Sequence, residues 1–123
     1  HKPKFKSYAK SIMWDNFIGT TSSIMVCKDA LIDAECFDED FPALQDYDLY
    51  IRICQKYNVM GINKPLMNYL NNHSKNQLSQ NIKNFQIACE LLKIKYKNVP
   101  YSSILFISLT KIKIKKKIKE LYE

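Results

Sequence analysis

Residues 37–57 read FDEDFPALQDYDLYIRICQKY, an acidic segment followed by a mostly apolar one. The part up to Pro42 is acidic, ends in proline and has no apolar period, which is typical of a loop. From Asp46 onward, apolar side chains recur three and four residues apart and share one wide face, which predicts a helix. Asp46 is the expected N-cap, because a short carboxylate can accept a hydrogen bond from a free backbone amide. This stretch therefore predicts an acidic loop that leads into a helix with a buried face.

Further helices are expected on both sides of this segment. Residues 5–17 and 29–34 fit short helices. The sequence SKNQ at 74–77 has the form of a capping box, and after it apolar residues recur at steps of four and three as far as Tyr96. This pattern predicts a long helix.

Three short apolar runs predict strands, at residues 22–27, 59–62 and 66–70, the last two joined by a turn at 63–65. A few short strands packed with helices, together with long C-terminal helices, indicate an α/β fold class. At 123 residues the chain has the size of one compact domain. Its 46% apolar and 25% charged residues exclude a disordered or low-complexity chain.

Charge is distributed unevenly along the sequence. The formal net charge is +7, yet residues 28–48 hold eight of the 12 acidic residues and residues 93–123 hold nine lysines. The basic end, 101–123, suits a helix with an apolar edge that includes Ile114 and Ile118. Such a helix can lie on anionic lipid at about 1 kcal/mol per Lys near the surface. Runs of lysine also occur as solvated faces with no partner, so both alternatives stay open.

Cysteine and glycine usage excludes several kinds of site. The four cysteines form no CxxC pair and no cluster with histidine, so neither a zinc ribbon nor a redox dithiol is indicated. We expect reduced thiols buried in apolar runs, although an even number of cysteines also permits disulfides. With two glycines in total, the chain contains no Gly-rich phosphate loop. The longest apolar stretch is too short to span a bilayer.

Several polar residues are candidates for chemistry from their type and spacing. Asp46 and Asp48 lie two apart at a helix start, so their side chains diverge and have separate roles, although an aspartate there is often only a cap. His73 precedes a helix N-terminus, which favours a neutral ring able to ligate a metal, although a loop histidine is more often a surface residue. The hydroxyls of residues 20–23 can line a sugar pocket. Residues 38–40 spell D-x-D but fit a solvated loop better than a metal site.

Four quoted elements lie in a specific order: NFIGTTSSIMV at 16–26, FDEDFPALQDYDLYIR at 37–52, GINKPLMNY at 61–69 and NHSKNQLS at 72–79. In this order they resemble the acceptor-side portion of glycosyltransferase family 2, which has the GT-A fold. The likeness covers about residues 10–80. It implies a partial GT-A-like domain, with the acceptor-side half that carries the catalytic base at residues 1–80 and a helical basic extension at 81–123.

The resemblance implies transfer of a sugar from a nucleotide-diphosphate donor to an acceptor hydroxyl, with inversion at the anomeric carbon, in the synthesis of surface polysaccharide or glycolipid. Asp46 matches the catalytic base of the family. Thr21, Ser22 and Asp48 are the residues expected to bind the acceptor. His73 matches a position that in some members completes the coordination of a divalent metal, manganese or magnesium.

The family's nucleotide-binding half, with its own D-x-D, is expected to precede residue 1. This chain alone is therefore expected to have no donor site, to bind no metal and to be inactive. Asp48 and Arg52 also fit helix-start and charge-partner positions. The implied location is the cytoplasm, at the inner face of the cell membrane, with a saccharide or lipid-linked acceptor. A chain without its neighbouring half is further expected to self-associate, through its apolar strands or the stripe at 78–96.

A non-catalytic role is the alternative. The lysines of residues 93–123 can hold anionic lipid or nucleic acid by charge alone, whereas the family resemblance implies no nucleic-acid partner. The two functions place the working surface differently. Sugar transfer needs Asp46 and His73 to face one cleft, and the basic module needs only the lysine-rich end.

Overall fold

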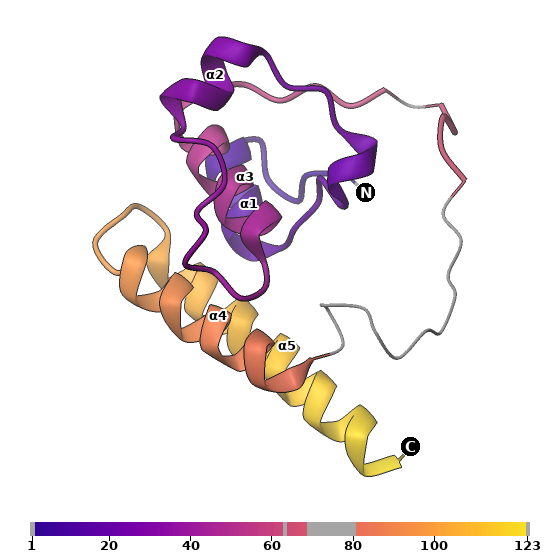
Figure 1. Ribbon diagram of the computed structural model, residues 1–123, viewed down its shortest axis with the longest axis vertical. Helices are drawn as coiled ribbons and strands as arrows, with labels where there is room; N and C mark the ends of the chain where they lie inside the picture. The colour runs from indigo at the N-terminus through magenta and orange to yellow at the C-terminus, as the bar shows by residue number, and fades with distance from the viewer. Residues whose placement is uncertain (1, 63, 69–80, 123) are drawn as a thin grey trace.

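The structure is a computed structural model that describes residues 2–62, 64–68 and 81–122, with side chains described as far as residue 118. Figure 1 shows α1, α2 and α3 in one part of the molecule and α4 and α5 side by side in another. The elements are α1 (Tyr8–Trp14), the short 3₁₀ helix η1 (Thr21–Ser23), α2 (Lys28–Asp33), α3 (Gln45–Lys56), α4 (Ile82–Lys95) and α5 (Ser102–Tyr122). The helices expected from the sequence are thus confirmed over the described residues.

Helix α3 supplies much of the core, because its wide apolar face is almost entirely covered. It packs on α1, α1 also contacts α5, and α5 contacts α4. The Tyr47 hydroxyl ties α3 to α1 by donating to the carbonyl oxygen of Ile12 at 2.7 Å. The Ser108 hydroxyl ties α5 to the end of α1 by donating to the Trp14 carbonyl. The buried residues of α3 are Tyr47, Asp48, Leu49, Tyr50, Ile51, Ile53 and Cys54.

The helix starts are capped in different ways. Asn81 caps α4 by accepting a hydrogen bond from the Asn84 amide at 3.2 Å. The expected capping box at 74–77 lies outside the described residues. The prediction that Asp46 caps α3 was wrong, because Leu44 is the N-cap and Asp46 is the second residue of the helix. Leu44 reverses the chain with a φ of 61°, a left-handed conformation that a side chain makes unfavourable by about 1 kcal/mol.

The expected α/β fold class is wrong for the described part of the chain, which has helices and irregular segments but no strand. Residues 22–27 form part of η1 and then an extended segment. Residues 59–62 and 64–68 are irregular and largely exposed. A strand needs a neighbour that satisfies its backbone N–H and C=O groups, and these segments do not pair with one another. Apolar composition alone does not distinguish a strand from an unpaired extended segment.

The unpaired segments leave large apolar side chains in solvent. Met25 is 100% exposed, Met60 90% and Leu66 72%. Because burying such surface is favourable, we expect self-association, seen by light scattering as a molar mass that rises above 14.5 kDa with concentration. The double variant Met60→Ser, Leu66→Ser should shift the chain toward monomer, whereas Ile32→Ser, on the exposed side of α2, should not. A strict monomer at all concentrations would contradict the expectation.

The cysteines and the helix lengths bear on two further expectations. All four thiols are free, as expected. Cys54 and Cys89 are buried among apolar side chains, but Cys27 and Cys36 are exposed, so burial was predicted correctly for only two of them. No helix within the described ranges has the length and apolar character needed to cross a membrane.

Candidate functional site

A pocket of about 360 Å³ lies where the start of α3 faces η1, α4 and α5. It contains Asp46 and Thr21, two residues that the sequence singled out, and brings them together from positions far apart in the chain. Polar and aromatic side chains share its wall. The lining residues are Asn16, Thr21, Phe37, Ala43, Leu44, Gln45, Asp46, Phe85 and Lys116.

Asp46 is held at the pocket wall by the first turn of α3. Its Oδ1 accepts a hydrogen bond from the Tyr47 amide at 2.8 Å, which fixes the carboxylate close to its own backbone. Burial raises the pKa of Asp46, and hydrogen bonds from backbone amides oppose this only in part. One turn further along α3, burial raises the pKa of Tyr50 to about 12, and the charge of Asp46 adds to that effect. The carboxylate is therefore more basic than an exposed aspartate, as a general base requires.

The raised pKa makes the stability of the chain depend on pH in a defined direction. Because the folded state binds the Asp46 proton more tightly than the unfolded chain does, ionised Asp46 destabilises the fold. This cost is fully present above the raised pKa and disappears as the pH falls toward the ordinary value of 3.8. We therefore expect Asp46→Asn to melt at a higher temperature than the wild type at neutral pH, and at the same temperature in acid.

Thermal melts followed by circular dichroism over a pH series measure this difference. Asp40→Asn is the matched control, because Asp40 is an exposed aspartate on the preceding loop. Its melting temperature should follow that of the wild type at every pH. If Asp46→Asn were less stable than the wild type at neutral pH, burial would not be the cause of the shift at Asp46.

Lys116 is a pocket residue that the sequence reasoning missed, because it lies within the basic tail. Its ammonium lies over the Phe85 ring, 3.7 Å from the ring centroid, and burial lowers the pKa of Lys116. The positions on the helix contain the missing signal: position 116 shares a face with the buried Leu109 and Leu105, seven and 11 residues earlier. Position 114 lies on the opposite face.

The remaining predicted site residues lie in different places. Thr21 and Ser22, the first two residues of η1, are both exposed, and of the two only Thr21 lines the pocket. Asp48 points away from the pocket into the interior, where it is fully buried. His73 lies outside the described residues, so its relation to Asp46 is not part of this geometry. Over the described ranges, no three His, Cys, Asp or Glu side chains cluster in a way that holds a metal ion.

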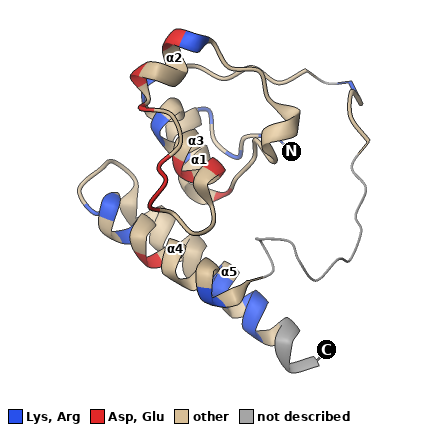
Figure 2. Cartoon of the chain, viewed as in Figure 1, with Lys and Arg blue, Asp and Glu red and all other residues tan. Residues whose placement is uncertain are grey.

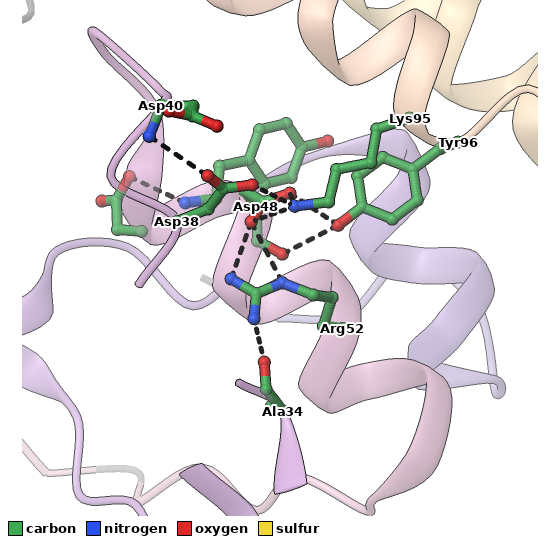
Figure 3. A network of polar contacts seen from close by, with 9 residues as sticks. Ala34, Asp38, Asp40, Asp48, Arg52, Lys95 and Tyr96 are labelled. Carbon is green, nitrogen blue, oxygen red and sulfur yellow. Dashed lines mark hydrogen bonds and ion pairs between the residues drawn. The ribbon is translucent and has the colours of Figure 1, made fainter. Parts of the chain in front are cut away.

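Asp48 is the centre of a buried network of polar contacts, shown in Figure 3. The Arg52 guanidinium donates to Asp48 Oδ2 twice, at 2.7 Å from Nη2 and 3.0 Å from Nε. The Tyr96 hydroxyl donates to Oδ1 at 2.7 Å, and the Lys95 ammonium lies 3.0 Å from the same oxygen. Arg52 also donates to the Ala34 carbonyl. Each carboxylate oxygen thus has charged or polar donors, and the charge-partner interpretation of Asp48 and Arg52 is confirmed.

The same network joins three segments that are distant in sequence. Lys95, the last residue of α4, pairs with Asp48 and also with Asp38 on the acidic loop, at 2.6 Å. Asp38 in turn accepts from the Asp40 amide at 3.1 Å. Residues 38–40 are therefore anchored by an ion pair rather than merely solvated. The network fixes the loop and the end of α4 against the helix that carries Asp46.

Comparison of the chain with protein-family models, curated proteins and solved structures gives no match. These comparisons therefore neither support nor contradict the resemblance to glycosyltransferase family 2.

Proposed function

We propose that this chain forms the acceptor side of an inverting sugar-transfer site, with Asp46 as the base that takes the proton from an acceptor hydroxyl. One observation carries the proposal: a partly buried carboxylate with a raised pKa lies on the wall of a pocket lined by polar and aromatic side chains. It is the residue that the sequence resemblance assigns to this role. Sugar sites need such a mixture, because sugars present both hydroxyl groups and apolar C–H faces.

The residues of the pocket divide the work. The acceptor hydroxyl donates a hydrogen bond to Asp46, and its proton moves to the carboxylate as the oxygen attacks the anomeric carbon and the bond to the leaving diphosphate breaks. The Thr21 hydroxyl and the Asn16 and Gln45 amides can bond other acceptor hydroxyls and so orient the attack. Asp48 is a positioning residue in this scheme, because it holds the first turn of α3 from the interior.

In this proposal the described residues supply neither a donor site nor a metal site. The sequence offers no Gly-rich loop for a diphosphate. Manganese or magnesium, which the resemblance implies, would neutralise charge on the leaving group when bound. The described residues do not offer a ligand set for it, so no step is assigned to it. The donor is proposed to be bound by residues outside this chain.

Transfer is tested with the protein produced from the open reading frame that encodes this chain. It is incubated with a panel of nucleotide sugars, manganese and saccharide or lipid-linked acceptors, and the anomeric configuration of any product is determined by NMR. We expect a product of inverted configuration from at least one donor. Retained configuration, or no transfer from any donor, would count against the proposal. Titration calorimetry of residues 1–123 with the same donors should show no tight binding.

The alternative function concerns a different surface. Binding of anionic lipid or nucleic acid would use the outer face of α5, where exposed lysines lie, and not the pocket that contains Asp46.

A further inference from the structure

Helix α5 has a second apolar stripe that faces away from the protein. Ile107, Ile114 and Ile118 are 52%, 54% and 50% exposed, and their spacing of seven and four residues aligns them on one face. Leu105 and Leu109, on the opposite face, are fully buried in the core. The outer stripe therefore lies outside the core cluster and is about half exposed to solvent.

Lysines flank this outer stripe. Residues 102–119 contain six lysines and no acidic residue, and Figure 2 shows Lys residues along α5. Lys113 is directed to Glu90 on α4, and Lys116 lines the pocket. Lys115 and Lys117 are exposed. Lys115 lies about 100° around the helix from Ile114, and Lys117 lies about 100° from Ile118 in the other direction, so one lysine borders the isoleucine stripe on each side.

We propose that this outer face of α5 docks on an anionic lipid bilayer. The helix would lie flat, with the three isoleucines at the boundary between the headgroups and the acyl chains and the flanking lysines at the lipid phosphates. The proposal makes no use of Asp46 or the pocket, so it stands or falls independently of the proposed sugar transfer.

Charge and apolar surface together favour a bilayer over the other occupants. Nucleic acid would need the lysines, but phosphate contacts leave an exposed isoleucine stripe without a function. A second copy of this face would bury the isoleucines, but it would bring lysines of one copy against lysines of the other, which is unfavourable. An anionic bilayer offers acyl chains that can cover the isoleucines and, directly above them, negatively charged headgroups that can pair with the lysines.

Binding is measured by co-sedimentation of the full chain with vesicles of phosphatidylcholine containing about 30 mol% phosphatidylglycerol, compared with vesicles of phosphatidylcholine alone. We expect clear partition into the anionic vesicles and little into the neutral ones. The variant Lys115→Gln, Lys117→Gln should lower the partition coefficient roughly 25-fold, because each lysine near the surface contributes about fivefold. The control Lys28→Gln, Lys64→Gln removes two exposed lysines elsewhere and should change it less than about threefold.

The apolar part of the contact has its own matched pair. Ile114→Ser should lower partition about fivefold or more, because one buried aliphatic side chain is lost from the lipid interface. Ile32→Ser, at a position on α2 that is 57% exposed, should leave partition unchanged. Far-UV circular dichroism verifies that each variant keeps its helices. Release of the wild-type chain as salt rises from about 50 mM to about 500 mM provides a test that needs no variant.

Several results would overturn the proposal. Equal partition into neutral vesicles, no partition at all, or equal losses in the control variants would each exclude an anionic bilayer contact through this face. Retention of the wild-type chain on the vesicles at high salt would do the same. So would tighter binding to a short DNA duplex than to vesicles, with dependence on Lys115 and Lys117 but not on Ile114, since that pattern identifies a nucleic-acid surface.

Discussion

Replacing Asp48 with alanine is expected to lower the free energy of unfolding by about 3–5 kcal/mol. The carboxylate is fully buried, and its removal leaves the Arg52 guanidinium, the Lys95 ammonium and the Tyr96 hydroxyl without their shared acceptor. Removing one partner of a buried charge network costs more than the interaction itself contributes, because the Arg52 side chain, 14% exposed, and the buried Tyr96 hydroxyl stay largely desolvated. Lys95 contributes less to this cost, since its side chain is 32% exposed and keeps the pair with Asp38. Urea denaturation, monitored by circular dichroism, measures the loss as a lower midpoint with an unchanged slope.

Asp33→Ala is the matched control. Asp33 also pairs with a lysine, Lys56 at 3.0 Å, but its side chain is 50% exposed. Surface ion pairs of this kind contribute little, since water solvates both charges when the pair is broken. The denaturation midpoint of Asp33→Ala should therefore remain close to that of the wild type. Similar midpoints for Asp48→Ala and Asp33→Ala would show that the buried network does not stabilise the fold.

The second large effect is expected in the transfer assay. Asp46→Asn should lower kcat by roughly 10²–10⁴, because an amide cannot accept the proton of the acceptor hydroxyl. The KM for the acceptor should change little, since the amide oxygen can still accept from the Tyr47 amide and the pocket keeps its shape. In the wild type, activity should fall on the acid side as Asp46 becomes protonated, at a pH above the ordinary aspartate range.

The matched control for this experiment is a variant at position 40. Asp40→Asn removes an exposed carboxylate from the same acidic loop and should leave kcat unchanged. A variant Asp46→Asn that keeps wild-type kcat, while transfer itself is observed, would assign the base to another residue. The higher melting temperature expected of Asp46→Asn makes unfolding an unsuitable explanation for lost activity.

The separation of the two aspartates was predictable from spacing alone. Residues two apart on a helix point in directions about 200° apart, so one faces the pocket when the other faces the core. The helical face of α3 was equally visible, because its buried positions are apolar at three- and four-residue steps. What spacing did not reveal was the partners of Asp48: Lys95 and Tyr96 lie 47 and 48 residues further along the chain.

The errors have a common physical cause. The strands expected at 22–27 and 59–62 were inferred from composition, but a strand exists only when a second segment pairs with it. Lys116 was treated only as part of the basic end, for which a lipid contact and a solvated face both stayed open, yet its helical face and the Phe85 ring place it in the pocket. Strand pairing and the Phe85 partner of Lys116 depend on tertiary neighbours that short-range patterns do not contain, whereas the helical face of Lys116 could have been read from the sequence.

Because α4 and α5 contribute to the pocket, the site cannot be separated from the C-terminal part of the chain. Phe85 and Lys116 belong to the helical hairpin, whereas Asp46 belongs to the first part of the chain. Residues 1–80 placed on another scaffold would therefore carry the carboxylate without two of the side chains that line its pocket. A complete pocket needs α4 and α5 together with the segment that carries Asp46.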